Sequence, residues 1–557
     1  MTTKPLRIVI IGGVAGGASA ATRARRMNEA AEIVLLEKDD EVSFANCGLP
    51  YYLGGEIAVR GKLLVATAEF LRRRFKLDVR TRHEARRIDP NSKCVEVFDH
   101  HSQQSYQLEY DKLILAPGAA PLTPSLEGLS ASGVFTLRNM SDTDRIHHAI
   151  GTSAGKRAAV IGSGFIGLEM VEQLQRRGFQ VSLAELQPHV LPILDPEMSQ
   201  PLMDELAAHG VSVHVGDGIQ KVMLDRAGGA SGVMLASGKV LDADLVILGL
   251  GVRPQTQLAV DAGLQIGASG GIATNRWLQS SDPHIYAVGD AAEYPYGPTG
   301  TSMRVALAGP ANRAGRLAGE HAATGQCAPM ASVFGTSIVR VFELSVGITG
   351  LSAASAKRFG IPSRSVTVIA NHHAGYYPGA QPLTLKLTYS PEDGRILGAQ
   401  AIGREGVDKR LDVVATAMAF RGTVRDLAGL DLAYAPPFGS AKDPIHQAAF
   451  AASNQLDGLE DFIDADADLT GLQVVDVRTT NEVRDRPLTA APQAINIPLD
   501  ELRTRYVELD RSARTVVSCG VGVRGHVAAR ILRQLGFHHV QNLTGGATLR
   551  ARAVPSR

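Results

Sequence analysis

The chain has 557 residues, with 57 Lys and Arg against 56 Asp and Glu, and 45% of its residues are hydrophobic. Charges this closely balanced do not favour a nucleic acid or a membrane surface as a partner. No apolar run approaches the ~20 residues of a transmembrane helix, and the first residues lack a signal-peptide pattern. We therefore expect a cytoplasmic protein of three or four domains.

The first 37 residues predict a strand–turn–helix–strand unit. An apolar strand at 7–11 leads into the glycine-rich turn 12–17, an alanine-rich helix follows, and the next strand ends at Glu37. Such a turn places phosphate at a helix N-terminus, and the acid at the second strand's end accepts hydrogen bonds from a ribose. Val14 stands where a middle glycine is usual.

The same unit returns at 157–185. A strand at 157–161 precedes the glycine turn 162–167, a helix is predicted from about 168 to 177, and the next strand ends at Glu185. Two such units in one chain predict two dinucleotide-binding folds, one nested in the sequence of the other.

The rest of the chain changes character twice. Residues 331–452 mix alternating strand patterns with helical ones, as in an α+β interface domain, and a polar linker follows at 453–462. A small α/β domain is expected at 463–557, with a helix from about His526 to Leu535 after its central loop. The remaining predicted boundaries are 1–150 with 272–330 for the first dinucleotide domain, and 151–271 for the second.

Three further segments resemble the pyridine nucleotide-disulfide oxidoreductase superfamily. Residues 285–290 (IYAVGD) resemble its second FAD signature, and 113–118 (LILAPG) and 245–251 (LVILGLG) resemble its domain-crossing strands. The resemblance implies FAD at the first fold and NAD(P)H at the second. The implied cofactor-binding residues are Gly12, Gly13, Val14, Ala15, Gly16, Gly17, Glu37, Lys38, Ala116, Gly118, Gly289 and Asp290 for FAD, and Gly162, Gly164, Phe165, Ile166, Gly167, Glu185 and Gly251 for NAD(P)H.

Glu185 favours NADH over NADPH, because a carboxylate accepts from a ribose 2′-hydroxyl and repels a 2′-phosphate. Arg176 and Arg177, nearby on the predicted helix, could soften this preference.

The segment 43–52 (SFANCGLPYY) holds one cysteine, Cys47. Most disulfide reductases carry two here, whereas this stretch resembles the single-cysteine subgroup of NADH oxidases, NADH peroxidases, coenzyme A disulfide reductases and persulfide reductases. Cys47 would act as a thiolate, whose pKa a nearby flavin and helix N-terminus would lower.

The run 12–26 (GGVAGGASAATRARR) resembles the coenzyme A disulfide reductases. Oxidase and peroxidase members carry a histidine where this chain has Ala15. Arg23 and Arg26, three residues apart on one helix, could grip a phosphate together, although a solvated basic face is the alternative. The implied coenzyme A contacts are Ser19, Arg23, Arg26, Ser43, Asn46, Arg74, Asn312 and Lys442.

Two later segments, 376–379 (YYPG) and 434–438 (YAPPF), resemble stretches of the same family. There, two tyrosines from the partner subunit act near the cysteine sulfur. The match implies Tyr376, with Tyr377 as the less close alternative, and Tyr434. It also implies a homodimer.

The C-terminal region resembles a rhodanese, on the residues 474–478 (VVDVR), 494–499 (AINIPL) and 542–546 (NLTGG). Between them, Cys519 stands at a predicted strand end, five residues before Arg524. A loop of this kind surrounds sulfur with backbone N–H groups. The loop residues are Gly520, Val521, Gly522, Val523 and Arg524.

The four cysteines, Cys47, Cys94, Cys327 and Cys519, form no Cys-x-x-Cys pair, so we expect neither a disulfide scaffold nor a metal site. Cys94 and Cys327 receive no role. The combined pattern predicts an NAD(P)H-dependent flavoenzyme that reduces persulfide, polysulfide or coenzyme A disulfide sulfur at Cys47, with sulfane sulfur delivered by Cys519. Alternatives are a coenzyme A disulfide reductase for thiol homeostasis, and an NADH oxidase or peroxidase whose rhodanese domain docks a partner.

Overall fold

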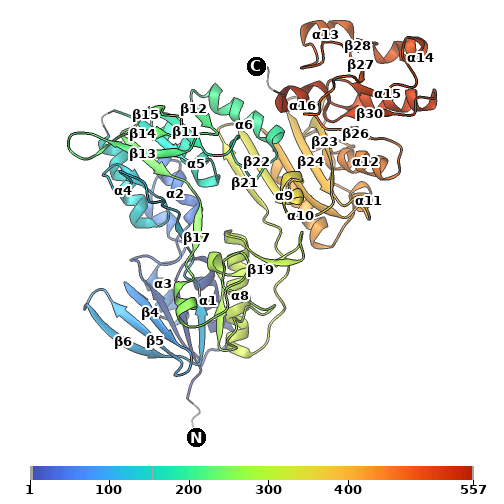
Figure 1. The fold of residues 1–557 in the computed structure, drawn as a ribbon. Coiled ribbons are helices and arrows are strands. Elements are labelled where there is room, and N and C mark those ends of the chain that lie inside the picture. Colours follow the sequence, from blue (N-terminus) through green and yellow to red (C-terminus); the bar gives the residue numbers. More distant parts are fainter. Residues whose placement is uncertain (1–3, 154, 555–557) are drawn as a thin grey trace. The chain divides into compact units, whose positions relative to one another are not determined.

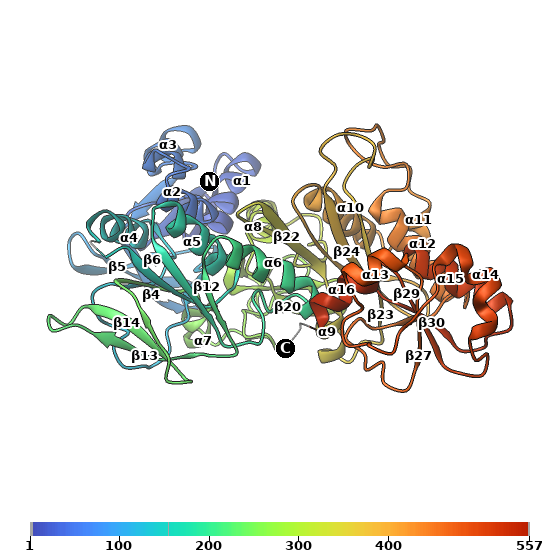
Figure 2. The same cartoon turned by 90° about the horizontal axis from the view of Figure 1, so that it is seen from above.

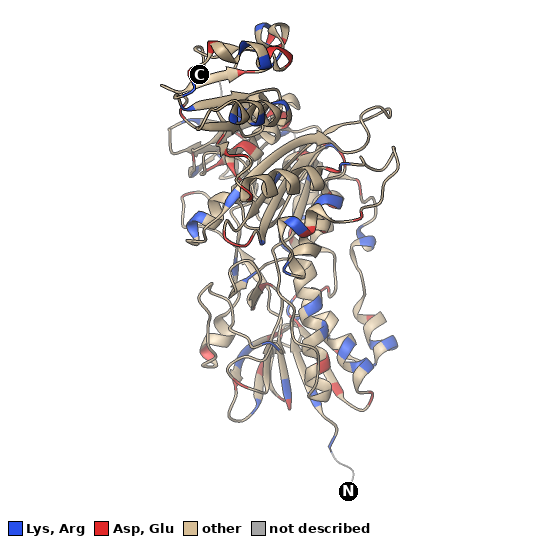
Figure 3. Cartoon of the chain, turned by 90° about the vertical axis from the view of Figure 1, so that its right-hand side faces the viewer, with Lys and Arg blue, Asp and Glu red and all other residues tan. Residues whose placement is uncertain are grey.

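The computed structural model describes residues 4–153 and 155–554. The chain divides into two compact units, one of residues 1–187 and 210–335, the other of residues 188–209 and 336–557. Basic and acidic residues are interspersed along the ribbon of both units (Figure 3). Among the helices of the described ranges, none combines the length and the apolar composition that a membrane crossing requires.

The first unit holds two parallel five-stranded sheets. In each, a central strand is apolar and almost wholly buried, as expected when both faces of a parallel sheet are covered. The first sheet has the order β18 (Ile285–Ala287), β7 (Lys112–Leu115), β1 (Arg7–Ile11), β2 (Glu32–Glu37), β3 (Asp78–Thr81). The second has the order β12 (Ser212–Val215), β11 (Gln180–Glu185), β10 (Arg157–Ile161), β16 (Leu245–Leu248), β9 (Val134–Phe135).

Each central strand leads through a glycine turn into a helix, α1 (Ala15–Met27) after β1 and α5 (Phe165–Arg176) after β10. Helix α8 (Ala308–Thr324) lies beside α1 (Figures 1 and 2). The two helices approach closely because a Cβ at Gly315 would meet the backbone of Gly16. Smaller antiparallel sheets complete the unit: β4 (His83–Asp89), β5 (Cys94–Asp99) and β6 (Gln104–Glu109); β13 (Ile219–Leu224), β14 (Ala230–Leu235) and β15 (Val240–Asp242); β8 (Ala119–Pro121) with β17 (Val252–Pro254); β19 (Glu293–Tyr296) with β20 (Thr301–Arg304).

The second unit begins with an antiparallel sheet covered by helices. The strand order is β21 (Ser337–Val341), β22 (Leu344–Gly350), β25 (Ile396–Gly403), β24 (Pro382–Tyr389), β23 (Arg364–Asn371). The associated helices are α9 (Ala353–Arg358), α10 (Val407–Ala419), α11 (Val424–Ala428) and α12 (Pro444–Leu456). Helix α12 runs into the predicted linker, because Tyr389 Oη donates to Gln455 Oε1 at 2.5 Å and fixes its last turn.

Residues 188–209, placed by the sequence in the second dinucleotide domain, group with this sheet instead. They contain α6 (Pro196–Ala208). Lys386 on β24 is buried between two carboxylates of this segment, Asp195 at 2.7 Å and Glu197 at 2.5 Å. Two ion pairs across long sequence separations thus fix α6 on the sheet.

The remaining residues form a parallel sheet with helices around it (Figures 1 and 2). Its core is apolar and includes Val475, Val517 and the side chain of Cys519. The strand order is β26 (Phe462–Ile463), β30 (Val540–Leu543), β29 (Thr515–Ser518), β27 (Gln473–Asp476), β28 (Ile495–Asn496), and the helices are α13 (Thr480–Asp485), α14 (Leu502–Arg505), α15 (Val523–Gln534) and α16 (Gly546–Ala553). The predicted fold class is confirmed.

Candidate active site

In the first glycine turn, position 12 requires glycine. Gly12 has φ +97°, and a Cβ there would collide with the carbonyl oxygen of Ala116. The backbone N–H of Gly13 donates to Glu37 Oε2 at 2.8 Å. Val14 has a negative φ of −92°, so this position does not need the left-handed conformation that favours glycine.

The second glycine turn repeats this geometry. Gly162 also has φ +97°, and its Cβ would collide with the carbonyl oxygen of Gly249. Ser163 donates to Glu185 Oε2 twice, from its backbone N–H at 2.8 Å and from its hydroxyl at 2.7 Å. Both acids therefore lie beside their turns, at the ends of β2 and β11, as predicted.

Both turns fit a dinucleotide. No side chain caps the N-terminus of α1 or α5, whereas Thr67 caps α3 (Ala68–Phe75) and Asn139 caps α4 (Met140–Thr152). The first-turn N–H groups of α1 and α5 are thus left for an anion, and each helix dipole favours one. Around Gly164 an added Cβ would meet nothing within 4 Å, which leaves open space for a phosphate.

Burial raises the pKa of Glu37, although hydrogen bonds from the backbone of Asp39 and Gly13 oppose this rise. The other predicted cofactor residues gather at the same strand ends. They are Ala15, Gly16 and Gly17 in the first turn of α1, Lys38 after β2, Ala116 and Gly118 after β7, Gly289 after β18, Phe165, Ile166 and Gly167 at the start of α5, and Gly251 after β16. Helix α5 begins at Phe165, one turn before the predicted start near residue 168.

Asp290 lies in a short 3-10 helix, Gly289–Ala291, directly after β18. Its Oδ2 accepts a hydrogen bond from Arg138 Nη2 at 2.9 Å. The carbonyl of Arg138 accepts from the side-chain amide of Asn46 at 3.2 Å, so one arginine links Asp290 to the cysteine segment. Arg138 belongs to no recognisable motif, and the sequence did not single it out.

Cys47 lies in the 3-10 helix Asn46–Gly48, immediately before α2 (Leu49–Gly54), and its side chain is exposed. Partial loss of solvent, and then the carboxylates of Glu169 and Asp290, raise the pKa of Cys47, whereas Arg138 lowers it. The protein groups alone therefore oppose the predicted thiolate stabilisation. A bound cofactor would have to supply that stabilisation.

The predicted coenzyme A contacts fall into separate groups. Ser19 Oγ donates to Asn312 Oδ1 at 2.6 Å, so α1 and α8 bring these two residues together. Arg23 pairs with Glu320 at 2.5 Å, while the guanidinium of Arg26 lies 5.1 Å from the ring centre of Phe75. Arg23 and Arg26 thus have different partners in this structure, and their joint grip on a phosphate stays a prediction.

The other members of that set are more dispersed. Ser43 has φ +50° and donates its N–H to the carbonyl of Gly13, so it and Asn46 lie near the first glycine turn and Cys47. Arg74 stacks over Phe70, with 5.8 Å to the ring centre. Lys442 belongs to the second unit and precedes α12.

The predicted tyrosines meet each other. Tyr376 lies between β23 and β24, Tyr434 lies between α11 and α12, and their hydroxyls are 3.0 Å apart. Tyr376 is 76% exposed and Tyr434 is 49% exposed, with Tyr377 beside them at 41%. The hydrogen bond with Tyr434 raises the pKa of Tyr376. An exposed pair of phenols is suited to donate a proton to a bound group.

The second sulfur site is built around Cys519, which follows β29 and is 1% exposed. The N–H of Gly522 donates to Cys519 Sγ at 3.1 Å. Gly522 has φ +101° and is the N-cap of α15, so Val523 and Arg524 lie in the helix, and the predicted helix start near His526 was about one turn late. Gly520 and Val521 complete the loop between β29 and α15, in which the N–H of Gly522 is directed at the sulfur.

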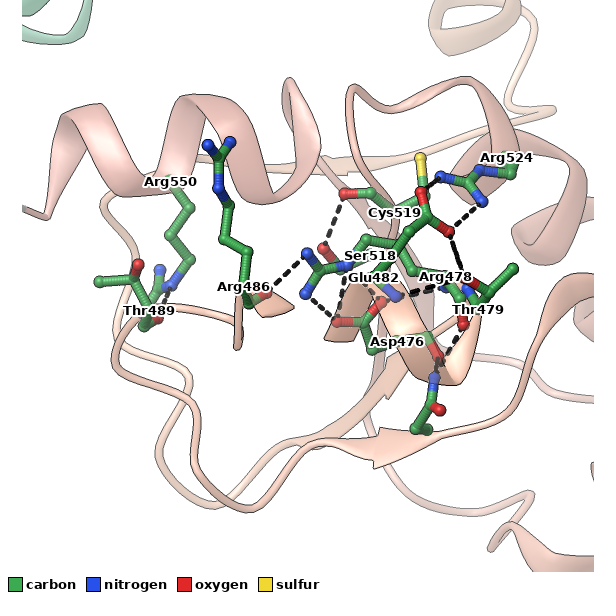
Figure 4. Close-up of polar contacts among 11 residues, drawn as sticks. Asp476, Arg478, Thr479, Glu482, Arg486, Thr489, Ser518, Cys519, Arg524 and Arg550 are labelled. Carbon is green, nitrogen blue, oxygen red and sulfur yellow. Dashed lines mark hydrogen bonds and ion pairs between the residues drawn. The ribbon is translucent and has the colours of Figure 1, made fainter. Parts of the chain in front are cut away.

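Arg524 is held beside this loop by a partner that the sequence did not reveal. Its guanidinium donates to both oxygens of Glu482, at 2.8 and 2.6 Å, as Figure 4 shows next to Cys519. Glu482 stands on α13, where it also accepts from the N–H of Thr479 in a capping box. A buried ion pair, Asp476 with Arg478 at 2.6 Å, fixes the chain just before that helix.

Comparison with known proteins agrees with this geometry. Residues 6–315 match the family described as Pyridine nucleotide-disulphide oxidoreductase, residues 336–444 match its dimerisation domain, and residues 458–549 match the Rhodanese-like domain. A coenzyme A disulfide reductase of Staphylococcus epidermidis is 33% identical over 446 residues, which cover 80% of this chain and 99% of that protein.

Two solved structures are similar over nearly the whole chain. Reduced Bacillus anthracis CoADR-RHD is 44% identical with a TM-score of 0.94, covering 99% of both chains. A NAD-dependent persulfide reductase from A. fulgidus is 34% identical with a TM-score of 0.90, covering 98% of this chain and 100% of that one. The family implies FAD and NAD(P)H as cofactors. The chain thus belongs to the pyridine nucleotide-disulphide oxidoreductase family and carries a rhodanese-like domain over residues 458–549.

Proposed function

We propose that this protein uses NAD(P)H and FAD to reduce persulfide, polysulfide or coenzyme A disulfide sulfur at Cys47. The observation that carries the proposal is the presence of two distinct sulfur sites: an exposed Cys47 near Asp290 and Arg138, and a buried Cys519 that accepts from the backbone N–H of Gly522. None of the four cysteines forms a disulfide, so Cys47 would exchange sulfur with a separate molecule and not with a second cysteine beside it. Four unpaired thiols also favour a cytoplasmic location.

The two glycine turns, with Glu37 and Glu185, would hold the two dinucleotides, and Asp290 would face the FAD ribityl chain. When bound, FAD would supply the two-electron relay between NAD(P)H and the sulfur at Cys47. The Cys47 thiolate would attack one sulfur of the substrate's S–S bond, so that a disulfide or persulfide bond forms at Cys47 while the other sulfur leaves with its electron pair. Reduction of that bond by two electrons would return Cys47 as a thiolate and release thiol or sulfide.

The tyrosine pair would supply a proton to the departing thiolate or sulfide. The hydrogen bond between Tyr376 and Tyr434 supports this role, because it orients the two phenol groups toward each other. By resemblance, these side chains would reach the active site of a partner subunit. The match of residues 336–444 to a dimerisation domain supports a homodimer.

Cys519 would carry sulfane sulfur. Its thiolate would attack the outer sulfur of a donor, forming a Cys519 Sγ–S bond while the donor's S–S bond breaks and its electron pair leaves with the remaining group. Coenzyme A would serve as carrier or substrate, contacting Ser19, Arg23, Arg26, Ser43, Asn46, Arg74, Asn312 and Lys442.

A coenzyme A disulfide reductase is the second candidate, because relatives with that name cover 80% of the chain without covering its rhodanese-like region fully. The two candidate functions are distinguished by the rates of anaerobic NADH oxidation with coenzyme A persulfide and with coenzyme A disulfide at equal concentration. The proposal predicts a higher kcat/KM for the persulfide, whereas a clear preference for the disulfide would favour the second candidate. Fast NADH oxidation with oxygen alone would favour an oxidase.

Glu185→Gln is expected to weaken the preference for NADH about tenfold, measured as the ratio of kcat/KM for NADH to that for NADPH. The amide can still accept from Ser163, but it no longer repels a 2′-phosphate. Arg176 is paired with Glu172 at 3.0 Å, so we expect Arg176→Gln to change the ratio by less than about twofold. An unchanged ratio in Glu185→Gln would remove this residue from nucleotide selection.

Glu482→Gln is expected to lower kcat/KM for sulfur transfer from thiosulfate to cyanide about tenfold, because Arg524 loses its bidentate partner. The glutamine oxygen can still accept from Thr479, so α13 keeps its cap. In the wild type, the hydrogen bonds from Arg524 lower the pKa of Glu482 to about 2. The stability that ionised Glu482 contributes through this pair is therefore fully present above the ordinary glutamate pKa of about 4.3, and it is lost as the pH falls toward 2. Two results would contradict the role of the Glu482–Arg524 ion pair: a step in the wild-type rate of sulfur transfer between pH 5 and 8 that Glu482→Gln removes, or a Glu482→Gln variant with full activity.

A further inference from the structure

The segment that joins α12 to β26 is held by the helix of the sulfur-binding loop. Residues 458–460 run along α15, and three side chains of that helix bind them. The contacts are Arg533 Nη1 to Gly458 O at 2.9 Å, Arg530 Nη1 to Leu459 O at 2.7 Å, and His526 Nδ1 to Glu460 Oε2 at 2.6 Å. The segment is therefore not a free tether between domains.

The Glu460 side chain is buried and makes a second contact inside the domain. Its side chain is 3% exposed, and its second oxygen, Oε1, accepts from Asn542 Nδ2 at 2.8 Å. The same Nδ2 donates to the carbonyl of Gly522 at 3.0 Å. Both neighbours are acceptors, which fixes the orientation of the Asn542 amide and uses both of its hydrogens.

Gly522 is the residue whose N–H donates to Cys519 Sγ. It holds φ +101°, a conformation that favours glycine and aims this N–H at the sulfur. Its carbonyl accepts from Asn542 and from the backbone of His526, at 3.0 Å each. A series of hydrogen bonds therefore runs from the Glu460 side chain through the Asn542 side chain to Gly522, the residue that contacts the nucleophile.

The Asn542 side chain is not needed to hold the strands together. The backbone N–H of Asn542 donates to Asp461 O at 2.8 Å, and that of Thr544 donates to Ile463 O at 3.0 Å, so β30 and β26 pair without it. Its buried amide serves the loop, and Gly525 leaves room for it, since a Cβ at that position would collide with Asn542 Oδ1.

We infer that Glu460 and Asn542 are positioning residues for sulfur transfer at Cys519, and that the interdomain segment is thereby part of the sulfur-transfer site. The inference rests on the proposed role of Cys519. In that step the Cys519 thiolate attacks the outer sulfur of thiosulfate, the thiosulfate S–S bond breaks, and sulfite leaves with its electron pair. Asn542, together with the N–H of His526, holds the Gly522 carbonyl and so keeps the Gly522 N–H directed at Sγ.

The test uses the full chain and thiosulfate-to-cyanide transfer, followed as thiocyanate. Asn542→Asp removes the donor to Gly522 O and sets a carboxylate against Glu460, so kcat is expected to fall on the order of 10–100-fold with KM for thiosulfate changed less than about twofold. Asn496→Asp is the matched control. The Asn496 amide also donates to two carbonyls of the same domain, Asp476 O and Arg478 O, both at 2.9 Å, but neither belongs to the Cys519 loop.

An exchange variant separates positioning from stability. Glu460→Gln combined with Asn542→Asp restores a hydrogen bond between the two side chains, because the glutamine donates to the aspartate, yet it supplies no donor to Gly522 O. The unfolding temperature is expected to recover toward the wild type, whereas kcat stays low.

Recovery of kcat in the exchange variant, or equal kcat in Asn542→Asp and Asn496→Asp, would overturn the inference. A different result would remove the proposed role of Cys519 itself: thiocyanate production by the wild type that persists in Cys519→Ser, or no persulfide on the wild-type Cys519 peptide by mass spectrometry after thiosulfate.

Discussion

Cys47→Ser is expected to lower NADH-dependent sulfide release from coenzyme A persulfide on the order of 10³-fold or more. A serine hydroxyl neither forms the sulfur–sulfur bond that is reduced nor leaves as a stabilised anion, so the acceptor half of the reaction is lost. The side chain is exposed and serine is close to cysteine in size, so FAD content and the unfolding temperature should stay at wild-type values.

The measurement is anaerobic NADH oxidation with sulfide detection, alongside flavin absorbance after NADH alone. The variant should still bleach its flavin with NADH, which separates loss of the acceptor from loss of cofactor. Cys94→Ser is the control, because Cys94 lies in β5 and has no proposed role. Sulfide release near the wild-type rate in Cys47→Ser would move the chemistry to another residue.

Cys519→Ser is expected to lower sulfur transfer from thiosulfate to cyanide on the order of 10³-fold. The rate of coenzyme A disulfide reduction is expected to stay within about twofold of the wild type. The reason is that Cys519 has its own donor, Gly522 N–H, and its own charged neighbour, Arg524. Serine is close to cysteine in size, so the buried site should still pack.

Cys327→Ser controls for general effects of thiol removal, because Cys327 follows α8 in the other unit. If Cys519→Ser left sulfur transfer intact, the rhodanese-like domain would be a binding module. If it also abolished coenzyme A disulfide reduction, the two sulfur sites could not be treated as separate.

The dinucleotide turns could be predicted from the sequence because their geometry is local. The strand, the glycines and the terminal acid of each unit lie within about 30 residues, so spacing alone predicts that Glu37 and Glu185 lie at the ends of the second strands, beside the glycine turns. The valine at position 14 is tolerated because φ there is negative, whereas Gly12 has a positive φ and a Cβ at Gly17 would collide with the carbonyl oxygen of Gly12.

The residues that organise the sites were missed for the opposite reason. Arg138 meets Asp290 across 152 positions, Arg524 meets Glu482 across 42, and Asn542 meets Glu460 across 82. Such pairs follow no helical or strand period, so they appear only when the chain is folded. The direction of the Cys47 pKa shift was hidden likewise, because Glu169 acts on it from α5.

Boundaries were the other weak point. Helix α15 begins at Val523 because Gly522 adopts a left-handed conformation, and the sequence does not indicate which glycine of the loop does so. Residues 188–209 joined the second unit through buried ion pairs to Lys386, whose partners could not be foreseen from charge alone.

The central claim is that electrons from NADH reach sulfane sulfur. It is tested most directly by the ratio of sulfide formed to NADH consumed, under nitrogen, with coenzyme A persulfide as the only acceptor. Each two-electron reduction converts one persulfide into one thiol and one sulfide, so the account predicts a ratio of about one. NADH oxidation without sulfide, or oxidation only after oxygen is admitted, would contradict it.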